Sequence, residues 1–145
     1  LDDKVFDKYL KNTDFKVIKG DNQALLSVSD ALILASGTVA LEAAIYNTPM
    51  IIAYRGPWLF YLVYLIVRCI KMVSLPNIIA NKIIVPEILQ GAVKVENITY
   101  EIERLLYERK YRDENIRELS KVKALLSDKV SSDEAAGEIS RSLYS

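Results

Sequence analysis

The sequence predicts an α/β fold: an incomplete Rossmann-like parallel sheet with flanking helices, followed by a helical carboxyl-terminal half. Residues 31–35 and 50–54 are uninterrupted apolar runs, which is typical of strands buried on both faces of a parallel sheet. A helical pattern over residues 38–46, ended by Asn47 and Pro49, joins the two runs through short links. A strand, a helix and a strand in this order predict a right-handed parallel βαβ unit.

Weaker signals precede this unit. Residues 2–11 have helical spacing, residues 15–19 read as a short strand, and residues 22–29 read as a short helix. The chain begins on a polar, acidic segment without an initiator methionine or a signal-peptide pattern. We therefore expect the sequence to be part of a longer protein.

The second half is predicted to be helical. A short helix is expected after Ser74, and Pro86 is expected in the first turn of another that ends at Gly91. Helices follow at about 98–110 and 113–127, and a last helix is expected to begin at Ser131. We predict a single incomplete domain over residues 1–145, with a βαβ portion at 1–57 and a helical portion at 58–145.

Composition narrows the class of function. Apolar residues make up 51% of the chain, which indicates a folded globular protein. Nineteen basic and nineteen acidic residues give a net charge of zero, which disfavours a nucleic-acid partner. The sequence has no histidine, which excludes histidine-based catalysis and histidine metal ligands from this chain. Its single cysteine, Cys69, fits a reducing compartment.

The most informative segment is Ser36-Gly37-Thr38, between the end of a predicted strand and the start of a helix. Open α/β sheets bind ligands at this place, and the backbone N–H groups of the helix start favour an anion. Gly37 permits close approach to the backbone, and the two hydroxyl groups add donors. The pattern suits the diphosphate of a nucleotide.

Glu42 follows Thr38 by four residues, so both lie on one face of the predicted helix. Its carboxylate would point back toward the ligand, where it would accept hydrogen bonds from the paired hydroxyls of a ribose. The alternative is structural: Ser36 or Thr38 caps the helix, and Glu42 is a solvated acid near the helix dipole. Spacing alone does not separate the two interpretations.

Four motifs in order carry a resemblance to a known family. They are Ser29-Asp30-Ala31 through Ala35-Ser36-Gly37-Thr38-x-Ala40-Leu41-Glu42, Pro49-Met50-Ile51-Ile52-x-Tyr54-Arg55, Val73-Ser74-Leu75-Pro76-Asn77-Ile78-Ile79-Ala80, and Val85-Pro86-Glu87-Ile88-Leu89-Gln90. Together they resemble the lipid A disaccharide synthase family, and Asp133-Glu134-Ala135-Ala136 is similar to its closing helix. The resemblance runs from about residue 20 to the end.

The resemblance implies the carboxyl-terminal domain of a GT-B glycosyltransferase, in which two Rossmann-like domains face each other across a cleft. Residues 1–57 would then be the nucleotide-sugar-binding portion. The family transfers 2,3-diacylglucosamine from its UDP donor to 2,3-diacylglucosamine 1-phosphate, with inversion, and forms a β-1,6 linkage. It implies no cofactor and no metal, because the helix dipole and backbone N–H groups stabilise the leaving diphosphate.

The resemblance also assigns roles to single residues. Ser36, Gly37 and Thr38 would contact the diphosphate, and Glu42 the ribose. Four more would line the donor site: Asn77, Arg55, Glu87 and Gln90. Structural alternatives exist for three of them, since Arg55 fits a surface ion pair, Asn77 a helix cap and Glu87 a first-turn acid.

The family's amino-terminal domain supplies the acceptor site and the general base, a carboxylate, so this chain holds no predicted catalytic residue. Its expected partners are the UDP-sugar donor, the acylated glucosamine phosphate acceptor and that amino-terminal domain. We expect the chain alone to be inactive. The expected location is the cytoplasm, peripheral to the inner membrane of a Gram-negative bacterium.

Residues 58–67 form an apolar run of ten residues, which is too short for a membrane span. One interpretation is a core helix. The others are a helix that contacts the membrane interface or acyl chains, with Arg68 and Lys71 beside it, and a homodimer surface.

Two alternative functions stay open. One is a different GT-B transferase that uses another UDP-sugar. The other is a non-catalytic nucleotide-binding or membrane-associated module.

Overall fold

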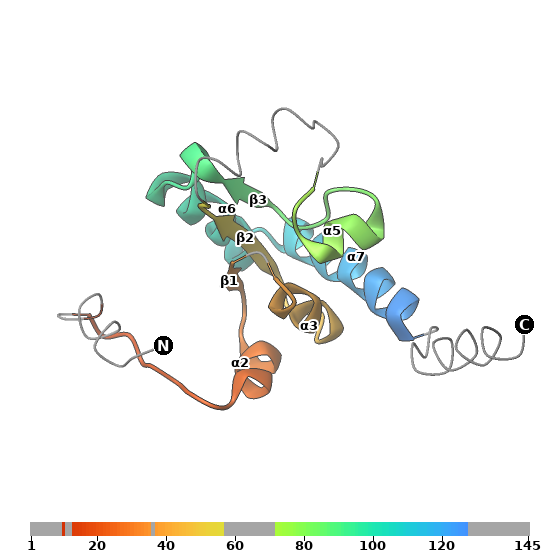
Figure 1. Cartoon of the computed structure of the whole chain (residues 1–145), viewed down its shortest axis with the longest axis horizontal. Helices are drawn as coiled ribbons and strands as arrows, with labels where there is room; N and C mark the ends of the chain where they lie inside the picture. The colour runs from red at the N-terminus through yellow and green to blue at the C-terminus, as the bar shows by residue number, and fades with distance from the viewer. Residues whose placement is uncertain (1–9, 11–12, 36, 57–71, 128–145) are drawn as a thin grey trace, which may run out of the picture.

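A parallel three-stranded sheet lies at the centre of the computed structural model, which describes residues 10, 13–35, 37–56 and 72–127. The strands are β1 (Leu32–Leu34), β2 (Met50–Tyr54) and β3 (Glu87–Leu89), in the order β1-β2-β3. Leu32 pairs with Met50, and Ile52 pairs with Glu87. Figure 1 shows the sheet and the labelled elements around it. The predicted parallel βαβ unit is therefore confirmed.

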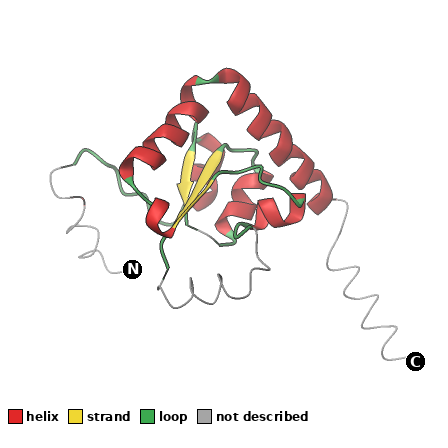
Figure 2. Ribbon diagram, turned by 90° about the horizontal axis from the view of Figure 1, so that it is seen from above, coloured by secondary structure: helices red, strands yellow, loops and turns green. Residues whose placement is uncertain are grey.

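Helices cover both faces of the sheet (Figure 2). They are α2 (Asn22–Val28), α3 (Val39–Ile45), α5 (Leu75–Ala80), α6 (Val95–Tyr107) and α7 (Arg109–Ser127), with a 3₁₀ turn η1 (Gln90–Ala92). One core contains residues of α2, α3, α5 and α7 together with Met50 and Ile52. The other contains Ile51 and Ile88 against Leu105 of α6. Successive residues of β2 therefore face different helix layers.

Strand β2 is buried as predicted, whereas β1 is not. Met50, Ile51 and Ile52 are fully buried, because β2 has a strand on each side and helices on each face. Ile33 in β1 is 54% exposed. The prediction that β1 is buried on both faces is wrong, because β1 is the edge strand of the described sheet and α6 packs over β2 and β3.

Helix α3 confirms the helix predicted at 38–46, with Thr38 and Tyr46 as its caps. Asn47, which follows it, adopts a left-handed φ of 57°, and the chain then turns into β2. Asparagine is among the residues that tolerate this conformation. Helix α2 confirms the prediction at 22–29, and the hydroxyl of Thr48 donates to the Leu26 carbonyl at its end.

Two predicted elements are wrong. The helix expected from Pro86 is strand β3 preceded by Pro86, whose carbonyl accepts a hydrogen bond from Ile52 N at 2.9 Å. Proline is tolerated there because the ladder needs its carbonyl and not an N–H. The strand expected at residues 15–19 is not formed: residues 13–20 have irregular backbone and are exposed. No strand of the described sheet pairs with them.

The two long helices are confirmed with shifted starts, at Val95 and Arg109 rather than about 98 and 113. Three predicted features lie outside the described residues: the helix at 2–11, the apolar run at 58–67, and the helix from Ser131. The division of the chain at residue 57 stays a prediction. Residues from both portions, Met50 and Val85 among them, belong to one core.

Candidate functional site

The carboxyl ends of the three parallel strands lie at one edge of the sheet, and the loops that follow them form the candidate site. Gly37 and Thr38 follow β1, Arg55 follows β2, and Gln90 follows β3. Because the strands are parallel, these residues share that edge, which is where open α/β sheets bind ligands. The sheet therefore brings together four of the eight predicted site residues.

The segment before α3 has an open helix start. The first backbone hydrogen bonds of the helix are accepted by the Gly37 carbonyl, from Ala40 N, and by the Thr38 carbonyl, from Leu41 N and Glu42 N. The backbone N–H groups of Gly37, Thr38 and Val39 therefore have no carbonyl acceptor within the helix and are available to an anion. A Cβ placed on Gly37 would meet no atom of the described residues within 4 Å, so the space beside it is open.

Thr38 occupies the N-cap position, but its side chain makes no capping hydrogen bond. The structural alternative assigned the hydroxyl of Ser36 or Thr38 to that cap. The absence of that hydrogen bond disfavours the capping role for Thr38, and its exposed hydroxyl is left for another partner. The prediction for Ser36 lies outside the described residues.

Glu42 lies one turn into α3, as its spacing predicts. Its backbone N–H donates to the Thr38 carbonyl at 3.1 Å, which fixes the two residues on one face of the helix. The side chain is exposed and forms no ion pair with a described residue. The carboxylate is therefore uncommitted, as a ligand-binding role requires. That role stays a prediction.

Arg55 and Gln90 occupy the same edge from the next two strands. Arg55 is exposed and makes no ion pair within the described ranges, so the surface ion-pair alternative has no partner there. Gln90 begins η1 with a left-handed φ of 51°, which is uncommon for a residue with a Cβ. Gln90 is thus placed by a special backbone turn directly after β3.

The expected place of Glu87 in the first turn of a helix is wrong, whereas its role at the donor site stays a prediction. It is the first residue of β3, opposite Ile52, and its side chain points to the start of α5 rather than to the edge of the sheet. Its carboxylate accepts hydrogen bonds from Val73 N at 3.0 Å, Ser74 N at 2.9 Å and Ser74 Oγ at 2.7 Å. An acid at a helix start is favourable because of the exposed N–H groups. Glu87 thus holds the entry into α5.

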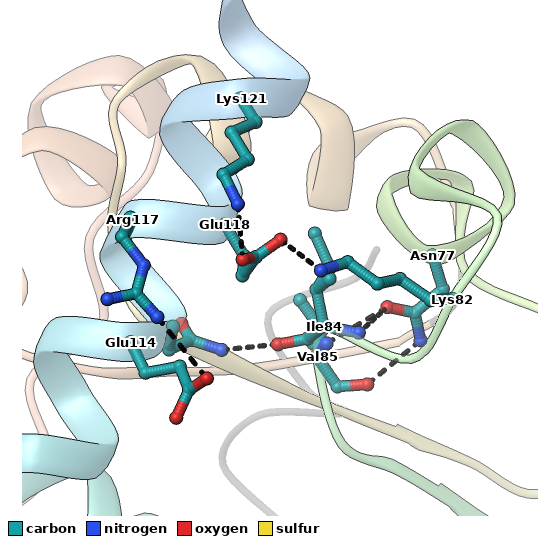
Figure 3. A network of polar contacts seen from close by, with 9 residues as sticks. Asn77, Lys82, Ile84, Val85, Glu114, Arg117, Glu118 and Lys121 are labelled. Carbon is teal, nitrogen blue, oxygen red and sulfur yellow. Dashed lines mark hydrogen bonds and ion pairs between the residues drawn. The ribbon is translucent and has the colours of Figure 1, made fainter.

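Asn77 completes this network and is fully buried. Its Nδ2 donates to Glu87 Oε1 at 2.7 Å and to the Val85 carbonyl at 2.9 Å. Its Oδ1 accepts from Ile84 N at 2.8 Å and Val85 N at 2.9 Å (Figure 3). The amide has no capacity left for a ligand in this arrangement. It joins α5 to the segment before β3, and contact with a substrate stays untested.

Sequence reasoning missed a second polar cluster near the start of β3. The Glu118 carboxylate of α7 pairs with Lys121 at 2.7 Å and with Lys82 at 2.5 Å (Figure 3). Hydrogen bonds from Lys121 and Lys82 lower the pKa of Glu118 to about 2. Nearby, Asn115 Nδ2 donates to the Ile84 carbonyl at 2.7 Å. These contacts join α7 to the loop before β3. The i,i+3 spacing of Glu118 and Lys121 was the available sequence signal.

Metal chemistry has no candidate ligand set in the described ranges: no three histidine, cysteine or acidic side chains there are grouped to hold an ion. Within the same ranges, no helix has both the length and the apolar character needed to cross a bilayer.

Comparison with known proteins identifies the family. A family profile described as lipid-A-disaccharide synthetase matches residues 3–140. The lipid-A-disaccharide synthase of Anaeromyxobacter dehalogenans strain 2CP-1 is 36% identical over 131 residues, which cover 88% of this chain and 34% of that protein. The enzyme of the same name from Colwellia psychrerythraea is 42% identical over 103 residues, which cover 70% of this chain and 25% of that protein.

The chain thus spans about a third of the length of the curated relatives that it matches. No solved structure matches it. The family match covers both the βαβ unit with its open helix start and the network around Glu87. The chain therefore belongs to the lipid-A-disaccharide synthetase family.

Proposed function

We propose that this chain is the nucleotide-sugar-binding part of a lipid-A-disaccharide synthase. The complete enzyme would transfer 2,3-diacylglucosamine from its UDP donor to 2,3-diacylglucosamine 1-phosphate and release UDP. The observation that carries the proposal is the coincidence of the family match with an open helix start at the carboxyl edge of the sheet. That edge is where a doubly wound sheet holds a nucleotide.

The proposed chemistry is an inverting displacement. The 6-hydroxyl of the acceptor attacks the anomeric carbon, the bond to the diphosphate breaks, and a base takes the hydroxyl proton. Negative charge then grows on the departing diphosphate. Gly37, Thr38 and Val39 precede the ladder of α3, so their N–H groups would stabilise that charge. This requires no metal ion and assigns this chain to leaving-group stabilisation.

Glu42 would bind the ribose. Its backbone N–H donates to the Thr38 carbonyl, so its backbone lies one turn below the proposed diphosphate position, within reach of the ribose for its side chain. An ionised carboxylate accepts hydrogen bonds from two neighbouring hydroxyls, which a ribose supplies. Arg55, exposed at the end of β2, would add positive charge at the same edge.

The base and the acceptor site would belong to an amino-terminal domain across the cleft. We propose that the isolated chain binds nucleotide but does not turn over both lipid substrates. The complete enzyme would work in the cytoplasm, peripheral to the inner membrane, because both substrates carry acyl chains.

Calorimetric titration with UDP and with uridine tests the proposal. Wild type should bind UDP more tightly than uridine, because the helix start recognises the diphosphate. Gly37→Ala should reduce the affinity for UDP and leave uridine binding unchanged, since the added methyl meets no described atom of the protein and crowds only the ligand. An unchanged unfolding midpoint would verify the fold of the variant. Equal affinity of wild type for UDP and uridine would refute the proposal.

A further inference from the structure

A cavity outside the candidate site lies between α6, α7 and the loop that precedes β3, and its volume is about 350 Å³. The loop enters β3 at the amino end of the strand, away from the carboxyl edge that carries Gly37. In Figure 3, Lys82 of this loop reaches across to Glu118 of α7. The polar part of the lining consists of Lys82, Glu101, Tyr111, Glu114, Asn115 and Glu118.

Helix α7 gives the cavity a polar wall. Tyr111, Glu114, Asn115 and Glu118 follow the helical repeat, so they share one face of α7, and all four line the cavity. Glu101 lines it from α6. Burying polar groups is costly unless each finds a hydrogen-bond partner. The partners that these groups have in the structure therefore show which kind of partner the cavity still needs.

Asn115 has a buried oxygen without a partner. The residue is 4% exposed, and its Nδ2 donates to the Ile84 carbonyl at 2.7 Å. That bond fixes the orientation of the amide, because only its nitrogen can donate to a carbonyl. Its Oδ1 receives no hydrogen bond from any described residue. Asn115 and Ile84 both line the cavity, so the amide lies in the cavity wall with an acceptor that still needs a donor.

Two carboxylates of the lining also have an unused oxygen. Glu101 receives both of its contacts, from the Tyr111 hydroxyl at 2.8 Å and from Arg104 at 3.5 Å, on Oε2. Glu114 contacts Arg117 through Oε1 at 3.3 Å. Within the part of the chain that the structure describes, no group donates to Oε1 of Glu101 or to Oε2 of Glu114. These oxygens are two further free acceptors.

The donors of the described lining already have partners. The ammonium group of Lys82 pairs with the Glu118 carboxylate, and the Tyr111 hydroxyl donates to Glu101. Three acidic side chains face one lysine in this lining. The other cations that contact these acids lie outside the lining. The cavity therefore combines an excess of acidic groups with unused acceptors.

We propose that this cavity binds a small organic ammonium ion, with Asn115 Oδ1, Glu101 Oε1 and Glu114 Oε2 as its hydrogen-bond acceptors. An ammonium group has several N–H donors and no acceptor, so it matches these three oxygens in both charge and hydrogen bonding. Ile83 and Pro86, which also line the cavity, supply apolar surface for a short alkyl chain. This second site does not depend on nucleotide binding at the carboxyl edge.

NMR titration of the whole 145-residue chain with 1,4-diaminobutane tests the site. The side-chain NH₂ group of Asn115 is the reporter, and that of Asn97, which is exposed and donates to the Ala92 carbonyl, is the reference. The diamine should shift the Asn115 signals saturably and leave those of Asn97 unchanged. No shift at Asn115, or an equal shift at Asn97, would overturn the proposal.

Two analogues of the diamine separate charge from hydrogen bonding. 1,4-Butanediol lacks the charge, and the bis(trimethylammonium) analogue retains the charge but lacks every N–H donor. Neither should shift the Asn115 signals as the diamine does, because the proposed contacts need a charged donor. If either analogue binds as tightly as the diamine, the cavity does not recognise an ammonium group.

Variants locate the acceptors. Glu114→Gln keeps the shape but removes a charge and should weaken diamine binding about threefold. Glu103→Gln is the matched control, since Glu103 is an exposed acid of α6 outside the cavity, and the affinity should not change. Equal weakening in both variants would indicate general surface charge and contradict the site.

Asn115→Leu removes the buried acceptor and should weaken binding at least about tenfold. The backbone amide of Ile84 then serves as the reporter, because the side-chain signals of Asn115 are lost. The unfolding midpoint of this variant checks its fold, and if it does not fold, the comparison of Glu114→Gln with Glu103→Gln decides. A folded Asn115→Leu that binds the diamine as tightly as wild type would refute the role of Oδ1 and with it the proposal.

Discussion

The side-chain amide of Asn77 donates a hydrogen bond of 2.7 Å to the carboxylate of Glu87. The resemblance placed both residues at the donor site, yet each is committed to the other and to the backbone around it. Together they attach the start of α5 to the start of β3, next to the βαβ unit that carries the candidate site. Their direct effect is expected on stability, with any effect on ligand binding passing through the position of α5.

Asn77→Ala should lower the free energy of unfolding by about 3 kcal/mol, because it leaves buried N–H groups of Ile84 and Val85 without acceptors. Urea denaturation of the purified chain measures the change. Asn97→Ala is the matched control, since Asn97 is exposed and makes one bond, to the Ala92 carbonyl. It should cost less than about 1 kcal/mol. Equal losses of unfolding free energy in the two variants would show that Asn77 does not have this structural role.

Glu87→Gln keeps the shape of the side chain but replaces one acceptor oxygen with an NH₂ group, which cannot accept from the donors of Val73, Ser74 and Asn77 together. We expect a loss of about 2 kcal/mol in the free energy of unfolding. The exposed Glu103→Gln on α6 is the control and should be nearly neutral. A neutral Glu87→Gln would show that its charge does not hold α5.

Glu118 should make stability depend on pH in the acid range. Its pKa is lowered from 4.5 to about 2 in the folded chain by Lys121 and Lys82. Between these values the unfolded chain binds a proton that the folded chain does not, so stability falls as the pH falls through that window. Urea unfolding at several pH values should show a smaller decline for Glu118→Gln than for wild type. Parallel declines would contradict the ion-pair assignment.

Tyr111 should ionise later than an ordinary tyrosine. Burial and a hydrogen bond of 2.8 Å from its hydroxyl to Glu101 raise the pKa of Tyr111 above 10. Its stabilising contribution is therefore complete below pH 10 and is lost as the pH rises through the folded value. Ultraviolet titration should detect one late phenolate in wild type that is missing in Tyr111→Phe. If Tyr111→Phe instead loses a tyrosine that ionises in the ordinary range, with no change in late ionisation, the assignment is refuted.

The βαβ unit was predictable because its signals are local. Apolar runs of five residues indicate β1 and β2, and the interval between them contains a helix and its end at Asn47. The same sequence could not predict the exposure of Ile33, since burial depends on which strand lies beyond β1. The residues within each run were enough to predict a strand, whereas the burial of that strand depends on which other parts of the chain pack against it.

Strand β3 and the Glu87 network were missed for a related reason. Proline followed by glutamate fits the first turn of a helix as well as the start of a strand, and only pairing with Ala53 and Ile52 decides between them. Asn77 and Glu87 were singled out by the family resemblance. A resemblance does not show whether such residues contact a ligand or form a hydrogen bond with each other. Gly37, Thr38 and Arg55 were expected at the ends of strands and lie at the carboxyl edge, because parallel strands deliver their ends to one edge, whereas Gln90 was expected in a helix. The contact of these residues with a ligand stays a prediction.

The most direct test of the nucleotide site compares two first-turn acids by calorimetric titration with UDP. Glu42→Ala, on α3, should weaken UDP binding by about 1–3 kcal/mol, because a carboxylate that binds the ribose is lost. Glu96→Ala removes the equivalent acid from α6 and should leave the affinity unchanged. If Glu42→Ala binds UDP as tightly as wild type, or if both variants weaken binding equally, the ribose contact and the site built on it are contradicted.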